Sequence, residues 1–298
     1  MAEATIPVDL FNPGQVFACH GLLTVADRLL GDAEAAFDWT THGATRFVLR
    51  ARGVENPVER ALRFLASAEV VALAPHATTH EADWNKNSWG SIRVLADGAP
   101  YPFANPSSPA TLAAELRSGN EVIVIDHWGD STDRRDNVKF WAGSGGYPGA
   151  ALARDALELV RSKCNTATSD PFAVAAPQSS SFSLDWRRNY IPIDAGFSVN
   201  NHADIKTVGY PLVELLAAIG LTDGRPARIS WRDKLNYRFG VVGRPRAEST
   251  WYAPPLLRAA LGGAALPFPS RRFHMSLGWP GKEGQARAIT TVIEETTA

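Results

Sequence analysis

Apolar residues recur every three or four positions in several stretches of the chain, which is the spacing of one face of a helix. Residues 19–30 read CHGLLTVADRLL and stop before Gly31, a residue type that often ends helices. Asn56 is a predicted helix N-cap, because Pro57 follows it at the first helical position. Gly220 is expected to end another helix. The pattern predicts helices at residues 19–30, 58–68, 108–118, 148–164, 211–219 and 256–261.

Other stretches alternate between apolar and polar residues or are short apolar runs, both of which are typical of strands. The pattern predicts strands at residues 46–51, 69–74, 121–126, 235–242, 273–277 and 288–293. Because strands and helices do not alternate regularly along the chain, a doubly wound parallel sheet is not supported. The expected fold class is α+β, with mixed, largely antiparallel sheets and several short-to-medium helices.

Charge is distributed unevenly, although the whole chain has a formal net charge of −1. Residues 1–133 carry 9 Lys and Arg against 17 Asp and Glu, whereas residues 225–287 carry 12 against 3. We therefore expect an N-terminal acidic α+β region at residues 1–120 and a C-terminal α+β region with a basic surface at residues 121–298. The two can also form one continuous domain. A basic zone within a near-neutral chain favours a subunit that shares its affinity for a polyanion with partners.

Cysteine usage and hydropathy indicate where the protein works. Cys19 and Cys164 lie far apart in apolar helical patterns, so neither a disulfide framework nor a zinc site is expected. This cysteine usage favours a reducing compartment. No stretch approaches the roughly 18 apolar residues that a membrane span needs. The first residues lack the basic and then apolar run of a secretory signal. We expect a cytoplasmic protein with no membrane association and no cofactor.

The most informative stretch is residues 133–149, DRRDNVKFWAGSGGYPG, which joins cations, an aromatic pair and a glycine-rich loop before a predicted helix. Cations, flat rings and free backbone amides suit a phosphodiester chain. The loop is neither a Walker loop nor a dinucleotide fingerprint, and a plain tight turn is the alternative interpretation. The residues that we expect to hold phosphates here are Arg134, Arg135, Lys139, Gly143, Gly145 and Gly146.

Three further groups extend this predicted interface. The sequence WRRNY at residues 186–190 contributes Arg187 and Arg188, and the basic segment at residues 225–246 contributes Arg232 and Lys234. Arg and Lys in a groove neutralise phosphates, but a solvated charged surface is the alternative. The loop DWNKNSWG at residues 83–90 holds candidate base readers, because amides pair with adenine and lysine with guanine. These base readers are Asn85, Lys86 and Asn87.

A catalytic interpretation depends on Asp126, His127 and Asp130, which follow a predicted buried strand. Together they suit a hard metal ion for phosphodiester cleavage. No glutamate or second histidine lies at ligand spacing, and the chain has no Gly-x-Ser-x-Gly motif. We therefore expect no catalytic residue, no metal and no enzyme activity, and a metal-dependent nuclease stays the alternative.

Four long stretches resemble a known family. They read IPVDLFNPGQVFACHGLL, WGDSTDRRDNVKFWAGSGGYPGAALARDAL, SSSFSLDWRRNYIPIDAGFS and LGWPGKEGQARAITTV. They are similar to the small large-subunit-type protein of type I-U (I-G) CRISPR–Cas effector complexes, and the resemblance spans nearly the whole chain. It implies a component of a crRNA-guided surveillance complex similar to Cascade. In such complexes the large subunit reads the protospacer-adjacent motif and helps to open the duplex, while guide pairing supplies the sequence specificity.

The expected function is thus a non-catalytic subunit that binds nucleic acid within this complex. Its expected partners are crRNA and target DNA, the backbone and crRNA-processing subunits, and a nuclease-helicase that is recruited transiently. A purely structural bridging subunit, whose acidic N-terminal half binds a basic neighbour, is a third possibility.

Overall fold

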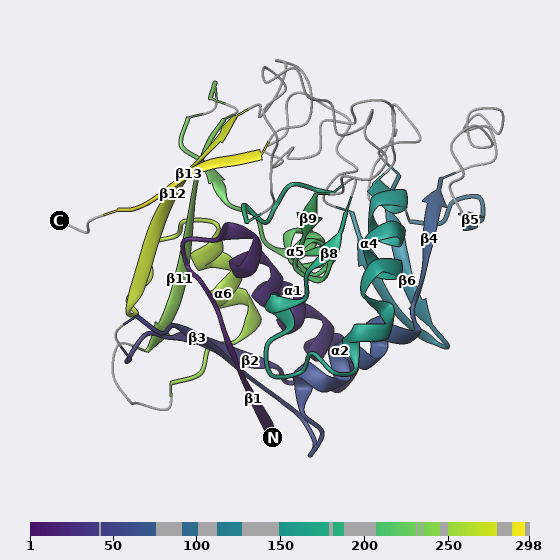
Figure 1. Cartoon of the computed structure of the whole chain (residues 1–298), viewed down its shortest axis with the longest axis horizontal. Helices are drawn as coiled ribbons and strands as arrows, with labels where there is room; N and C mark the ends of the chain where they lie inside the picture. The colour runs from purple at the N-terminus through teal and green to yellow at the C-terminus, as the bar shows by residue number, and fades with distance from the viewer. Residues whose placement is uncertain are drawn as a thin grey trace.

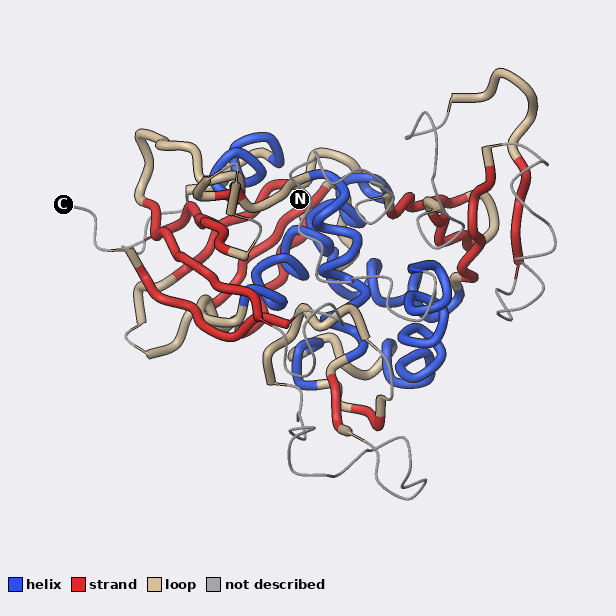
Figure 2. Tube along the Cα trace, turned by 90° about the horizontal axis from the view of Figure 1, so that it is seen from above, coloured by secondary structure: helices blue, strands red, loops and turns tan. Residues whose placement is uncertain are grey.

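The structure is a computed structural model of the whole chain. It describes residues 1–41, 43–75, 91–100, 112–126, 149–178, 181–187, 207–230, 232–233, 235–244, 250–278 and 288–295. Figure 1 shows two sheets with a group of helices between them, and Figure 2 shows the same arrangement from above. The described elements confirm an α+β fold with mostly antiparallel strands.

The main sheet joins strands from both ends of the chain in the order β1-β3-β2-β11-β12-β13, with β10 beside β11. All its pairs are antiparallel except β2 with β11. Its strands are β1 (Ala2–Pro7), β2 (Glu34–Asp38), β3 (Arg46–Ala51), β10 (Ala227–Arg228), β11 (Asn236–Arg244), β12 (Ser270–Gly278) and β13 (Ala288–Glu294).

A smaller sheet has the order β5-β4-β6-β7, and a two-stranded pair joins β8 to β9. In the smaller sheet, β6 and β7 lie on either side of the domain boundary that we expected near residue 120. The main sheet also combines strands from both sides of this boundary. These strands are β4 (Glu69–Ala74), β5 (Ser91–Val94), β6 (Ala114–Ser118), β7 (Glu121–Ile125), β8 (Ala176–Pro177) and β9 (Val208–Gly209).

Five α-helices and one 3-10 helix lie in the described part of the chain. Asn56 caps α2 as predicted, since its side chain accepts hydrogen bonds from the backbone N–H groups of Val58 and Glu59. None of the described helices combines the length and the apolar composition that crossing a bilayer requires. The helices are α1 (Pro13–Leu30), α2 (Pro57–Ser67), α4 (Gly149–Cys164), α5 (Pro211–Asp223), α6 (Pro254–Leu261) and the 3-10 helix η5 (Pro171–Ala173).

The helix predicted at residues 108–118 is wrong over its described part. Residues 114–118 form β6, which pairs with β4 on one side and with β7 on the other. The turn between β6 and β7 holds Gly119 at a φ of 58°, and Ser118 pairs with Glu121 across it. A two-residue Gly-Asn turn of this kind is a hairpin signal. Strand pairing on both sides here outweighs the local helix preference of the segment.

Helices α1 and α5 cross in the middle of the molecule, where Figure 1 shows them side by side. A Cβ on Gly21 would clash with the carbonyl oxygen of Leu216, and one on Gly220 would clash with that of Phe17. The two glycines therefore let the helix backbones approach closely. Our prediction that Gly220 ends α5 is wrong, because the helix continues to Asp223 and uses Gly220 for packing.

His20 lies on α1 within the core and is only 3% exposed. Neither ring nitrogen has a hydrogen-bond partner among the residues that the structure describes. Burial, aided by the charge of Arg258, lowers the pKa of His20 to about 3. The imidazole is therefore neutral in the folded protein at pH values where it is protonated in the unfolded chain.

Acidification is expected to destabilise the protein through His20. Below pH 6.5 the unfolded chain takes up a proton that the folded chain refuses until about pH 3, so stability falls with decreasing pH in this window. The slope is about 1.4 kcal/mol per pH unit. Urea unfolding of the wild type and of His20→Leu between pH 7 and pH 5 measures this change in the free energy of unfolding with pH. The variant should lose less stability than the wild type, and parallel pH profiles would contradict this account.

Candidate nucleic-acid interface

Most residues of the predicted interface lie outside the described part of the chain. Arg187 and Arg232 are described, and so is Asp126 of the alternative metal site. His127 and Asp130 of that metal site lie outside the described part of the chain. The predicted interface residues outside it are Asn85, Lys86, Asn87, Arg134, Arg135, Lys139, Gly143, Gly145, Gly146, Arg188 and Lys234. The prediction for these residues remains untested.

Arg187 is held in place by a buried carboxylate. Its Nη2 lies 2.6 Å from Oδ2 of Asp185, a residue that is 1% exposed, and also donates to the carbonyl of Phe172 at 2.8 Å. The guanidinium stacks over the ring of Tyr210 at 3.5 Å. An ion pair, a backbone contact and an aromatic face all restrain Arg187, so its guanidinium has one orientation. These contacts also stabilise the fold, whether or not Arg187 binds a ligand.

The carboxylate of Asp185 also ties its segment to the start of α1. Its Oδ1 accepts hydrogen bonds from Nδ2 of Asn12 and from the backbone N–H of Arg187, each at 2.9 Å. The buried carboxylate of Glu214 on α5 accepts from the backbone N–H groups of Leu184 and Asp185. The segment is thereby fixed between the first turns of α1 and α5. We had expected only a cationic and aromatic surface cluster here, and the role of the acids was not visible in the sequence.

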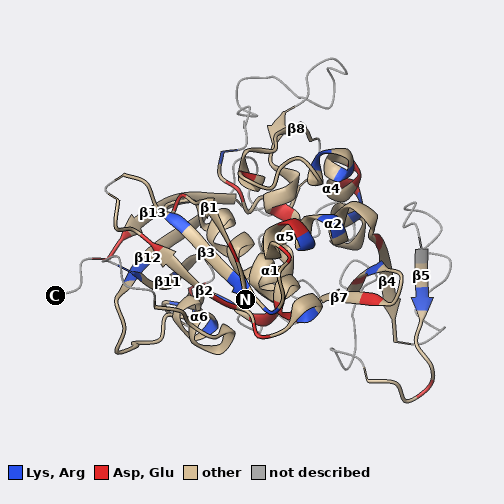
Figure 3. Ribbon diagram, turned by 90° about the horizontal axis from the view of Figure 1, so that it is seen from below, with Lys and Arg blue, Asp and Glu red and all other residues tan. Residues whose placement is uncertain are grey.

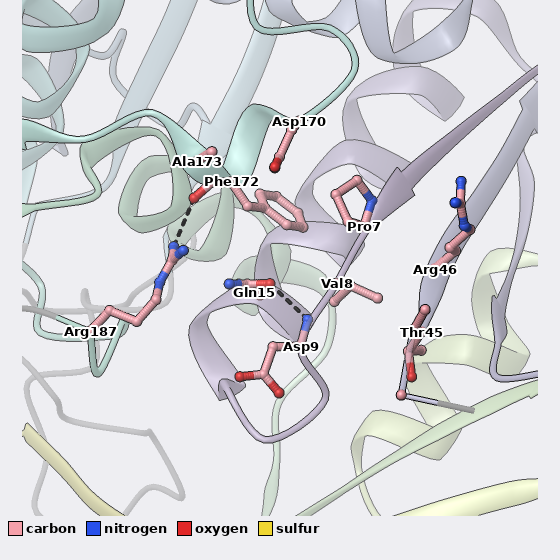
Figure 4. A pocket seen from close by; sticks show the side chains of 12 residues that line it. Pro7, Val8, Asp9, Gln15, Thr45, Arg46, Asp170, Phe172, Ala173 and Arg187 are labelled. Atoms are coloured by element: carbon pink, nitrogen blue, oxygen red, sulfur yellow. Dashed lines mark hydrogen bonds between the residues drawn. The ribbon is translucent and has the colours of Figure 1, made fainter. Parts of the chain in front are cut away.

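A pocket of about 460 Å³ lies between the end of β1, the start of β3 and η5. Figure 4 shows Arg187 and Arg46 on opposite sides of it. Arg46 begins β3, is exposed and forms no ion pair with a described residue. Asp9 and Asp170 also line the pocket, so its charge is balanced. The residues that line the pocket include two guanidinium groups, which donate hydrogen bonds, and two carboxylates, which accept them.

The basic segment at residues 225–246 is partly neutralised within the fold. Arg238 lies in β11 and pairs with Glu295 at 2.7 Å, whereas Arg225 lies 3.8 Å from Asp126. The guanidinium of Arg244 stacks on Trp251 at 4.8 Å. Arg232 is exposed and precedes β11, so it does not lie on the strand that carries Arg238. Figure 3 shows Lys and Arg interspersed with Asp and Glu over the described ribbon.

A polar cluster that the sequence did not reveal lies on β11 and β12. Nε2 of His274 and Oγ of Ser276 both lie within hydrogen-bond distance of Oδ1 of Asn236, at 2.9 and 2.7 Å. Nδ2 of Asn236 donates to Asp233 at 2.8 Å. The available signal was the alternation of polar Arg272, His274 and Ser276 with apolar residues along β12. The partner on β11 could not be read from that alternation.

Of the three residues of the alternative metal site, the structure describes Asp126. Asp126 follows β7, and its Oδ1 lies 3.8 Å from Nη2 of Arg225. Its backbone N–H donates to Oγ1 of Thr222 at 3.2 Å. Burial is the largest cause that raises the pKa of Asp126. Within the part of the chain that the structure describes, no three His, Cys, Asp or Glu side chains gather closely enough to hold a metal ion.

Comparison of the chain with protein-family models, with curated proteins and with solved structures finds no match. The resemblance to a CRISPR–Cas subunit therefore stays a prediction.

Proposed function

We propose that the chain is a non-catalytic, nucleic-acid-binding subunit of a crRNA-guided type I CRISPR surveillance complex. In this role it contributes to recognition of the protospacer-adjacent motif and to opening of the target DNA. Its partners are the crRNA, the target DNA and the other effector subunits. The proposal combines the resemblance of the four sequence stretches with the geometry of one described site.

The observation that carries the proposal is the pair of guanidinium groups across the pocket of Figure 4. Arg187 is pre-oriented by the buried Asp185, and Arg46 is exposed without an ion pair to a described residue. Guanidinium N–H groups donate to phosphate oxygens, and prior orientation lowers the entropy cost of binding. Asp185 and Phe172 already engage Nε and Nη2 of Arg187, so Nη1 is the donor that it can offer to a ligand. Asp9 and Asp170 supply acceptors that suit the amino groups of bases.

Loss of the Arg46 charge is expected to weaken nucleic-acid binding without affecting the fold. Removal of one phosphate contact on a single strand should lower the slope of log affinity against log salt by about 0.7 and reduce affinity across all sequences. Fluorescence anisotropy of the purified chain with labelled single-stranded RNA and DNA, over a salt series, measures both quantities for wild type and Arg46→Gln.

Arg28→Gln is the matched control. Arg28 is likewise exposed and lies in the last turn of α1, at the opposite end of that helix from the pocket. It should bind like the wild type. Equal salt slopes for Arg46→Gln and Arg28→Gln would remove the pocket from the interface. A wild-type chain that binds no nucleic acid at low salt would favour the purely structural bridging subunit.

A further inference from the structure

The polar cluster of Asp233, Asn236, His274 and Ser276 has a defined arrangement of protons. Asp233 accepts the backbone N–H groups of Leu235 at 2.8 Å and Asn236 at 3.1 Å. These bonds favour its ionised form, and its pKa is lowered chiefly by the bond from Leu235. An ionised carboxylate only accepts hydrogen bonds, so the Asn236 atom that faces it must be the amide nitrogen.

This orientation of the Asn236 amide fixes the groups on β12. Its oxygen faces His274 and Ser276 and can only accept, so Nε2 of the imidazole carries a proton and the Ser276 hydroxyl donates. In the neutral ring, Nδ1 is then a hydrogen-bond acceptor. Nδ1 makes no hydrogen bond to a described residue. With the imidazole in its neutral form, the cluster therefore presents an acceptor, and not a donor, at the half-exposed surface of the sheet.

Two arginines lie near this acceptor, and Glu295 already pairs with one of them. Arg272 lies two residues before His274 on the same face of β12 and forms no ion pair with a described residue. Arg238 lies opposite His274 on β11. The two nearby acids are already engaged, since Glu295 pairs with Arg238 and Asp233 holds Asn236. The site thus suits a ligand that brings a hydroxyl donor next to an anionic group.

We propose that His274 accepts a hydrogen bond from a ribose 2′-hydroxyl while Arg272 contacts the neighbouring phosphate, so that this face of the main sheet binds RNA in preference to DNA. The 2′-hydroxyl is the group by which proteins distinguish the two nucleic acids. Adjacent positions on one strand face are about 7 Å apart along the strand, which matches a contact to two groups of one nucleotide. This inference depends on the proposed nucleic-acid-binding function, and it assigns RNA to a defined site.

Three single-stranded oligonucleotides of one sequence test the inference directly with the wild-type chain: RNA, DNA and 2′-fluoro RNA. Fluorine keeps an RNA-like sugar conformation but cannot donate a hydrogen bond. We expect RNA to bind about fivefold more tightly than either of the others, the effect of one hydrogen bond. Equal binding of RNA and 2′-fluoro RNA would overturn the inference while leaving the proposed function intact. Absence of binding to all three would overturn both.

Two variants separate the roles of the residues. His274→Phe should lower RNA affinity to the level of DNA and leave DNA affinity unchanged, because only the acceptor is lost. Arg272→Gln should weaken RNA and DNA alike and reduce the salt slope by about 0.7. A His274→Phe variant that retains the wild-type preference for RNA would overturn the inference. Circular dichroism of each variant checks that the sheet is preserved.

Discussion

Gly220→Ala is expected to lower the free energy of unfolding by about 3 kcal/mol, because the added methyl group meets the backbone of α1. The built Cβ lies well inside the 3.0 Å limit of real contacts to the carbonyl oxygen of Phe17. Backbone atoms of a packed helix cannot rotate away as a side chain does. The better helix propensity of alanine offsets only about 1 kcal/mol. Urea denaturation followed by circular dichroism measures the change.

Gly262→Ala is the control for this prediction. Gly262 follows α6, has a φ of −73° and leaves at least 3.5 Å around a Cβ, so the substitution should change stability by less than about 0.5 kcal/mol. Gly21→Ala should be as harmful as Gly220→Ala, because it clashes with Leu216 across the same crossing. If Gly220→Ala unfolds at the same urea concentration as the wild type, the close crossing of α1 and α5 is wrong.

Asp185→Ala is expected to be similarly harmful, with a loss of about 3–5 kcal/mol, the usual cost of breaking a buried ion pair. The substitution leaves the Arg187 guanidinium without its buried counter-ion and leaves Nδ2 of Asn12 without its acceptor. It therefore loosens one wall of the pocket as well as the fold. Urea denaturation again gives the magnitude, and tryptophan fluorescence provides a second probe.

Glu158→Ala provides the matched comparison, since Glu158 pairs with Arg161 at 2.7 Å but its side chain is 60% exposed. Water screens such surface pairs, and its loss should cost less than about 1 kcal/mol. In a double-mutant cycle, Asp185→Ala and Arg187→Ala should be strongly non-additive. Additive effects would mean that the two side chains do not depend on each other, and Arg187 would then be available as a simple surface cation.

The pocket and the polar cluster differ in how they could be found. Arg187 belongs to a cluster that the sequence indicates as cationic. The sequence did not indicate that Asp185 would be buried and would hold the Arg187 guanidinium. The cluster at His274 depends on Asn236, 38 residues earlier, and is formed by strand pairing. Periodicity reports on neighbours along the chain, so it identifies which face of β12 is polar and not what lies across from it.

Local signals predicted much of the fold. The strands at Arg46–Ala51 and Glu69–Ala74 have the predicted bounds, and α4 begins within one residue of its predicted start. In each, alternation or helical spacing agrees with burial in the core. Prediction failed for β6, where two neighbouring strands decide the conformation, and for the end of α5, where a glycine serves packing between helices.

The sequence by itself determined the α+β class, most of the regular elements, the Asn56 cap and the uneven distribution of charge. These properties arise from the spacing of apolar residues and from the chemistry of single side chains. Only the tertiary structure decided that strands from the two ends of the chain share one sheet, that Gly21 and Gly220 meet, that Arg187 is bound to a buried acid and that His274 presents an acceptor. Each of these requires hydrogen bonds or contacts between residues far apart in sequence, and such pairings leave no local pattern.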